Sequence, residues 1–306
     1  DLLMANLKVN IAGVEFKNPI ITASGCFGFG REYEKMYPLE KLGGMSLKGT
    51  TYAERLGNPP PRIAETASGM LNSVGLQNPG VKHFIKEELP YLLDKGTVII
   101  ANAAGSALED YRMLAEELDQ SAVDMIELNI SCPNVKSGGM TFGASCESAS
   151  EIVREIRKAT SKPLMVKLSP NVTDIVSIAQ SVEAEGADAV SLINTLVGMR
   201  IDIESRRPIL HQNTGGLSGP AVFPVALAMV WKVANAVKIP VVGLGGVEKW
   251  QDAIEMMLAG ATGVQVGTAM FYDPYAPLKI IEGMNEWLDR NGIADVGEII
   301  GQVRPW

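Results

Sequence analysis

The chain has 306 residues, 46% of them hydrophobic, and a formal net charge of -8 at pH 7. This content is enough for a large core, and the negative charge argues against a general surface for nucleic acids or anionic membranes, which would need basic patches. No apolar run approaches the ~18 residues of a membrane span, and three scattered cysteines with two histidines predict a cytoplasmic protein without a disulfide framework or a zinc site.

Short apolar runs alternate with longer segments of helical period along most of the chain. Residues 7–16 (LKVNIAGVEF) alternate apolar and polar around Ala12-Gly13 and predict a hairpin. The runs that predict strands are residues 19–23, 44–47, 97–101, 124–130, 164–168, 189–193, 241–244 and 263–266. The segments that predict helices are residues 107–120, 146–160, 173–185, 222–237, 249–259 and 278–291.

This alternation of apolar strands and helices predicts an α/β fold, a closed parallel (β/α)8 or TIM barrel. The hairpin would close its bottom, and residues 50–88, rich in proline and glycine, predict a long functional loop over the C-terminal face. An open doubly wound sheet is the alternative, but Gly25, Gly28 and Gly30 lack the G-x-G-x-x-G spacing typical of it. No break in composition divides the chain, so residues 1–306 are expected to form a single domain.

Polar residues or glycines follow every predicted strand, where barrels of this type assemble their chemistry. They are Ser24-Gly25, Lys48-Gly49, Asn102, Asn129 with Cys132, Lys167, Asn194-Thr195, Gly245-Gly246 and Gly267-Thr268. None is a carboxylate, which argues against a metal site and against the paired acids of a glycosidase. Amides and lysines instead suit a planar, polar, anionic ligand.

The last two strands run into GLGG (243–246) and VGTA (266–269). Backbone N–H groups at the seventh and eighth strands of a barrel are a recurrent phosphate site, although each motif alone could be a tight turn. A phosphorylated ring cofactor fits, and FMN is the leading candidate. Lys167 lies in an apolar strand (LMVKLS) and would need an anionic partner, such as the edge of a reduced flavin.

Cys132 follows a predicted strand and precedes Pro133 and the glycine-rich residues 136–143 (KSGGMTFG), which predict a mobile lid. A thiol there could act as a general base near neutral pH if cations or polar donors surround it. The alternative is a small buried hydrophobe, the interpretation we give to Cys26 and Cys146. Spacing alone leaves both readings of Cys132 open.

Several of these blocks resemble dihydroorotate dehydrogenase, a family of FMN-containing barrels that oxidise dihydroorotate to orotate in pyrimidine biosynthesis. They run in order along nearly the whole chain and include SGCFGFG (24–30), GNPPPRIAET (57–66), MLNSVGLQNPG (70–80), ELNISCPN (127–134) and TGGLSGPA (214–221). A cysteine at position 132 implies the soluble class 1, because membrane-associated members have a serine base. NVKSGGMTFG (134–143) resembles class 1B, the NAD-linked type.

Class 1B implies a partner subunit with FAD and a 2Fe-2S cluster, NAD+ as final electron acceptor, and a homodimer core within a heterotetramer. Two alternatives remain open at this point. One is the fumarate-linked homodimeric class 1A enzyme, and the other is a flavin-free phosphate-binding barrel that is an isomerase or lyase.

The resemblance also implies roles for individual residues. Cys132 would take the proton from carbon 5 of dihydroorotate while a hydride leaves carbon 6 for flavin N5, with Lys48 as a second catalytic residue. FMN contacts are implied for Ser24, Lys48, Gly49, Asn102, Asn129, Lys167, Ile193, Gly219, Gly245, Gly246, Gly267 and Thr268. Substrate contacts are implied for Lys48, Asn72, Ser73, Val74, Gly75, Leu76, Asn129, Asn194 and Thr195.

Overall fold

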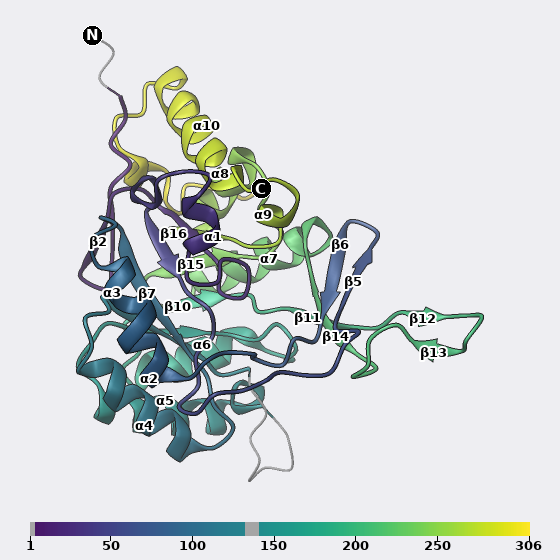
Figure 1. The fold of residues 1–306 in the computed structure, drawn as a ribbon. Coiled ribbons are helices and arrows are strands. Elements are labelled where there is room, and N and C mark those ends of the chain that lie inside the picture. Colours follow the sequence, from purple (N-terminus) through teal and green to yellow (C-terminus); the bar gives the residue numbers. More distant parts are fainter. Residues whose placement is uncertain (1–3, 132–140) are drawn as a thin grey trace.

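A closed parallel barrel of eight strands forms the centre of the protein, as predicted (Figure 1). The computed structural model describes residues 4–131 and 141–306. The strands follow one another around the barrel as β3 (Ile20–Thr22), β4 (Gly44–Ser46), β7 (Val98–Ala103), β8 (Met125–Asn129), β9 (Leu164–Lys167), β10 (Ala189–Leu192), β15 (Val241–Leu244) and β16 (Gly263–Val266). All eight coincide with predicted strands, and a closed barrel leaves none of them with an unpaired edge.

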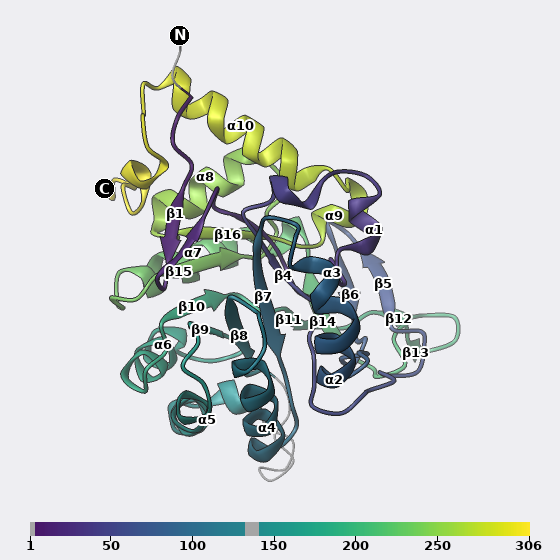
Figure 2. The same ribbon diagram turned by 60° about the vertical axis from the view of Figure 1, so that its left-hand side comes forward.

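Helices lie around the outside of these strands (Figures 1 and 2). The six predicted helices are confirmed as α4 (Leu108–Asp119), α5 (Cys146–Ala159), α6 (Ile175–Ala184), α7 (Phe223–Ala234), α8 (Trp250–Ala259) and α10 (Ala276–Arg290). The Asp174 side chain caps the start of α6 by accepting from the N–H groups of Val176 and Ser177. Gly260 ends α8 with a φ of 122°, in the left-handed region that favours glycine.

Shorter helical segments complete the described chain. They are α1 (Arg31–Glu34), α2 (Val81–His83), the π-turn η2 (Phe84–Glu88), α3 (Leu89–Leu92), α9 (Ala269–Tyr272) and the 3-10 turns η1 (Leu39–Lys41), η4 (Phe142–Ala144), η5 (Pro220–Val222) and η6 (Val296–Ile299). Within the described residues, no helix has the length and apolar character needed to cross a membrane.

The predicted hairpin closes the N-terminal end of the barrel. Strand β1 (Val9–Ile11) pairs with β2 (Val14–Phe16) across a turn at Ala12 and Gly13. Ile11 and Phe16 are both fully buried. A Cβ atom on Gly263, the first residue of β16, would lie 2.8 Å from Ile11 Cδ1, and one on Gly44 of β4 would lie 2.7 Å from Phe16 Cε1. The small residues at these strand starts therefore make room for the hairpin side chains.

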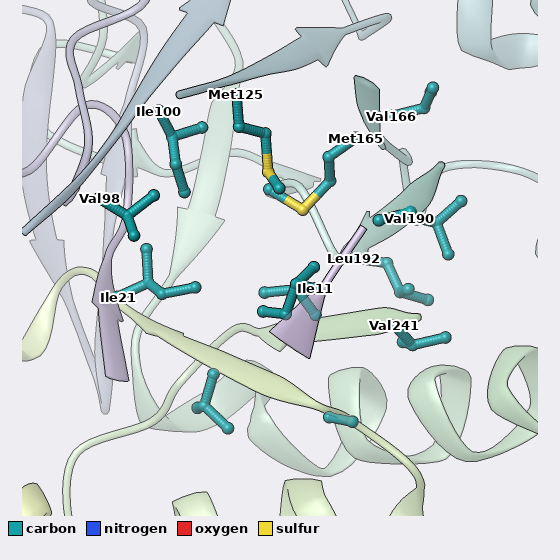
Figure 3. Close-up of a cluster of buried hydrophobic side chains, with 14 of the residues drawn as sticks. Ile11, Ile21, Val98, Ile100, Met125, Met165, Val166, Val190, Leu192 and Val241 are labelled. Atoms are coloured by element: carbon teal, nitrogen blue, oxygen red, sulfur yellow. The ribbon is translucent and has the colours of Figure 1, made fainter. Parts of the chain in front are cut away.

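The interior next to the hairpin is filled with apolar side chains. Figure 3 shows Ile11 among Ile21, Ile100, Met125 and Met165, and all five side chains are fully buried. Because these side chains converge from the hairpin and from different strands, this part of the barrel is a packed core and no ligand site.

The long segment 50–88 contains regular structure that its sequence did not predict. Strands β5 (Ile63–Thr66) and β6 (Gly69–Asn72) form an antiparallel pair, and β6 also pairs with β14 (Gly215–Ser218), which pairs with β11 (Leu196–Gly198). The sequence predicted a functional loop here but not these strands, because β14, which completes the pairing of β6, is far away in sequence. From this sheet a ribbon of β12 (Ile201–Asp202) and β13 (Arg207–Pro208) extends away from the barrel in Figure 1.

Candidate active site

A cavity of about 690 Å³ lies where the eight barrel strands end, a volume within the roughly 300–1,000 Å³ of small-molecule sites. Every residue predicted to contact FMN or substrate borders it. The FMN set is Ser24, Lys48, Gly49, Asn102, Asn129, Lys167, Ile193, Gly219, Gly245, Gly246, Gly267 and Thr268, and the substrate set adds Asn72, Ser73, Val74, Gly75, Leu76, Asn194 and Thr195. The structure thus brings both sets together, while their individual roles stay predictions. Cys132 and most of the predicted lid lie outside the described residues.

Two lysines face this cavity, and neither forms a direct ion pair with a described carboxylate. Lys167, the last residue of β9, is 6% exposed and its Nζ donates to Ser24 Oγ at 3.3 Å. Lys48 follows β4, and burial together with the positive charge of Arg62 lowers its pKa. In the described ranges, no carboxylate oxygen lies within 4.0 Å of either lysine nitrogen. The nearest described negative charge is that of buried Glu127, whose pKa Lys167 lowers through space. Because neither lysine has a carboxylate in direct contact, the cavity favours an anionic ligand.

Amide side chains at two strand ends form a connected group. Asn129 Oδ1 accepts from the N–H of Ser131 at 3.1 Å and from Asn194 Nδ2 at 3.2 Å. Asn194 Oδ1 in turn accepts from the N–H of Thr195 at 2.8 Å. With its oxygen engaged twice, Asn129 keeps its Nδ2 as a donor at the cavity wall.

A second wall comes from residues 72–76, which leave β6 and turn back toward the barrel. The side chain of Asn58 holds this turn, because its Nδ2 donates to the carbonyl of Ser73 at 2.9 Å. Gly75 has a φ of 77°, and a Cβ atom there would lie 2.6 Å from Asn58 Cγ. The position of this wall therefore depends on a glycine at 75.

The glycine-rich turns after β15 and β16 bring backbone to the same cavity. Gly245 and Gly246 have φ values of 120° and 72°, and a Cβ atom on Gly246 would lie 2.6 Å from the Gly219 carbonyl oxygen. Beside them Thr268 Oγ1 donates to Ser218 Oγ at 2.7 Å. Helix α9 starts directly after Thr268, whereas α8 starts only at Trp250. The turns bring backbone of two consecutive strand ends to one cavity, an arrangement that phosphate sites use.

One of the two cysteine interpretations is corrected by the structure. Cys146 is exposed at the start of α5, where a buried position was expected. Cys26 lines the cavity, and burial raises the pKa of its thiol to about 11 although Lys167 and Lys48 act in the opposite direction. Cys26 thus packs partly buried against the core, in line with its interpretation. Cys146 departs from it because its position belongs to no periodic apolar pattern that would fix its burial.

Sequence reasoning missed three charged residues close to the site, Glu127 in β8 and Arg55 and Glu248 at the cavity border. Glu127 is fully buried and hydrogen-bonded to Asn102 of the cavity wall. Its signal was present, because a glutamate stands inside the otherwise apolar run DMIELNI. Gln212 and Phe271 also border the cavity, and like Arg55 and Glu248 they come from outside the barrel strands, where no pattern pointed to them.

The fold and the site define a class: barrel enzymes that bind a phosphorylated ring cofactor at the carboxyl ends of their strands. Within this class, the chain belongs to the dihydroorotate dehydrogenase family, whose profile matches residues 6–288. The members of this family are flavin-dependent oxidoreductases that use FMN.

Curated relatives match over nearly the full length of the chain. A protein of Phocaeicola vulgatus is 56% identical over 301 residues, which cover 98% of this chain and 99% of the relative. One of Petrotoga mobilis is 53% identical over 300 residues, covering 98% and 100%. Both are named dihydroorotate dehydrogenase B (NAD(+)), catalytic subunit.

A solved structure shares the fold. It is the crystal structure of DHODH from Eimeria tenella in complex with ferulenol, with a TM-score of 0.78 and 23% sequence identity, covering 97% of this chain and 88% of that one.

The residues at the cavity fit the FMN that the family uses. Lys48 and Lys167 supply positive charge without a direct ion pair to a carboxylate, and the Gly245-Gly246 turn lines the cavity where its backbone could meet a phosphate. Asn102 Oδ1 is buried without a hydrogen-bond partner among the described residues. An acceptor left in this way is costly unless a ligand donor meets it.

Proposed function

We propose that the chain is the catalytic subunit of an NAD+-linked dihydroorotate dehydrogenase, which oxidises dihydroorotate to orotate with FMN in the central cavity. The observation that carries the proposal is the composition of the cavity: Lys48 and Lys167 border it without a direct ion pair to a carboxylate, together with amide side chains and residues 72–76. Dihydroorotate is an anion with imide-like edges, so lysine and paired amide groups match it.

Cys132 is the proposed general base. The proton leaves carbon 5 of dihydroorotate for the Cys132 sulfur, and the hydride leaves carbon 6, so that the new double bond joins these carbons. When bound, FMN supplies the hydride acceptor at its N5. Ser131, directly before Cys132, lines the cavity and is anchored through its N–H to Asn129 Oδ1, which supports this assignment.

The further path of the electrons is proposed from the relatives. Their names specify NAD(+) and a catalytic subunit, so a second subunit is expected to receive the electrons. That subunit would carry FAD and a 2Fe-2S cluster and pass the electrons to NAD+. Two copies of this chain would form the core of a cytoplasmic heterotetramer.

Purification from the native source tests the proposal. The expected preparation is yellow, contains a second polypeptide with FAD and iron, and reduces NAD+ when dihydroorotate is added. A single yellow polypeptide that turns over with fumarate and ignores NAD+ would favour the class 1A alternative. A colourless protein without dihydroorotate oxidation would favour the flavin-free isomerase or lyase.

A further inference from the structure

Glu127 receives four hydrogen bonds inside the barrel. Its Oε1 accepts from Ser46 Oγ at 2.7 Å and from Asn102 Nδ2 at 2.8 Å. Its Oε2 accepts from Ser191 Oγ at 2.9 Å and from Gln265 Nε2 at 2.7 Å. The donors belong to four different strands, β4, β7, β10 and β16. A carboxylate has about four lone-pair positions, so Glu127 is fully satisfied by the protein alone.

This group of five residues forms a polar layer directly below the cavity. Side chains alternate along a strand, so positions two apart point to the same side. Each of four layer residues lies two positions before a residue that borders the cavity: Ser46 before Lys48, Glu127 before Asn129, Ser191 before Ile193 and Gln265 before Gly267. The fifth, Asn102, belongs to the layer and borders the cavity itself.

Stability alone does not explain a carboxylate at this depth. A buried ion loses its hydration at a cost of several kcal/mol, and an apolar layer of the same shape is often as stable. Burial by itself raises the pKa of Glu127, but the positive charge of Lys167 and the hydrogen bonds from Ser46, Gln265 and Asn102 outweigh it and hold the pKa below its usual value. The layer is therefore negatively charged at neutral pH.

The carboxylate also fixes which way the Asn102 amide faces. An ionised carboxylate can only accept hydrogen bonds, so Asn102 must turn its Nδ2 toward Glu127 and its Oδ1 away. That Oδ1 has no partner in the described part of the chain. A Cβ atom on Gly49, a neighbour on the cavity wall, would lie 3.2 Å from it. Asn102 thus offers an acceptor where Asn129 offers a donor.

We propose that Glu127 is a positioning residue that sets the polarity and the charge of the cavity floor. It holds Asn102 Oδ1 in place as the acceptor for an imide N–H of a bound ring. Its negative charge also partly offsets the positive charge of Lys167 at the cavity floor. The inference rests on the proposed function, because it requires FMN in this cavity. The imide N–H belongs either to the flavin ring or to the pyrimidine ring of the substrate.

Glu127→Gln tests both parts of this role. Glutamine keeps the shape of the side chain but removes the charge. Where its N–H group faces the Nδ2 donor of Asn102, the Asn102 amide is expected to flip and turn its Oδ1 toward residue 127. Reduced flavin is an anion, so losing the buried negative charge should stabilise it. We expect the flavin reduction equilibrium to shift about tenfold toward the reduced form, a rise of ~30 mV in midpoint potential. We also expect ring binding to weaken by about tenfold because the acceptor is lost.

Two further variants complete the experiment. Thr22→Val is the control, because Thr22 is fully buried on β3, between β16 and β4, and its Oγ1 has no described partner. Glu127→Asp keeps the charge but is too short to reach all four strands. It should keep the midpoint potential of the parental protein and bind the ring about fivefold more weakly, which tests the positioning role even if Glu127→Gln does not fold.

The measurements are the midpoint potential of the bound flavin, the affinity of the apoprotein for FMN, and the affinity of the FMN-loaded protein for orotate. Weaker FMN binding assigns the N–H to the flavin, and weaker orotate binding with unchanged FMN affinity assigns it to the pyrimidine. Glu127 variants that match Thr22→Val in all three measurements overturn the inference. A parental chain that holds no FMN instead overturns the proposed function, so the two failures are distinguishable.

Discussion

The two halves of the barrel interior differ in chemistry although the same strands build both. Strand β7 contributes Ile100 to the apolar half beside the hairpin and Asn102 to the polar half below the cavity. Strand β8 likewise contributes Met125 to one half and Glu127 to the other. On both strands, the core residue and the site residue are only two positions apart, the spacing of successive inward-facing side chains.

This comparison separates stability from function along the barrel axis. Burying one large apolar side chain in the lower half stabilises the fold by roughly 1.5–3 kcal/mol. The upper half holds Lys167 and Glu127, whose charges are costly to bury and stabilise little by themselves. Substitutions in the two halves should therefore affect different measurements.

The largest effect is expected from Cys132→Ala, which removes the proposed base at the cavity. Dihydroorotate oxidation should fall by about 10²–10⁴-fold, the usual contribution of a general base, while FMN stays bound. Anaerobic rapid mixing, which follows flavin reduction alone, is the measurement. The exposed Cys146→Ala is the matched control. A Cys132→Ala protein whose flavin is reduced at the parental rate would remove Cys132 from the mechanism.

Met125→Ala should have the next largest effect, and on stability instead of catalysis. Met125 is fully buried in the lower half, so its truncation should lower the free energy of unfolding by about 2–5 kcal/mol. Urea unfolding gives this value, and turnover per bound FMN should stay near parental. An equal loss of turnover would show that the two halves are not separable.

Lys167→Ala should reverse this pattern. FMN affinity should fall about tenfold, as expected for a lost charge-assisted contact. The unfolding free energy of the apoprotein should fall less than in Met125→Ala, because the loss of a positive charge near buried Glu127 is its main cost. Titration of apoprotein with FMN measures the affinity. Lys158→Ala, which removes an exposed lysine on α5, is the control. Unchanged FMN affinity and reduction rate would argue against a flavin contact from Lys167.

The smallest expected effect concerns the two cysteines that the structure describes. With a thiol pKa of about 11, Cys26 should stay protonated and react slowly with iodoacetamide at about pH 8, because the thiolate is the nucleophile. Its reactivity should increase only as the pH approaches 11. Exposed Cys146 should react first. Peptide mapping by mass spectrometry measures both rates, and equal labelling would contradict a buried Cys26.

Much of this organisation could be predicted from sequence, for reasons that particular residues make clear. Buried parallel strands read as apolar runs, so all eight were found together with the residues that follow them. The β5–β6 pair was missed because β6 is completed by residues 215–218. The role of Glu127 could not be predicted, because its four hydrogen-bond partners come from strands far apart in sequence. The single-domain expectation for residues 1–306 stays a prediction.

The central claim is that this cavity oxidises dihydroorotate with FMN, and anaerobic mixing of the purified yellow protein with dihydroorotate tests it most directly. The account predicts that the visible flavin absorption bleaches and that orotate forms in an amount equal to the bound flavin. A protein whose flavin stays oxidised in the presence of excess dihydroorotate, under conditions where dithionite reduces it, would contradict the account.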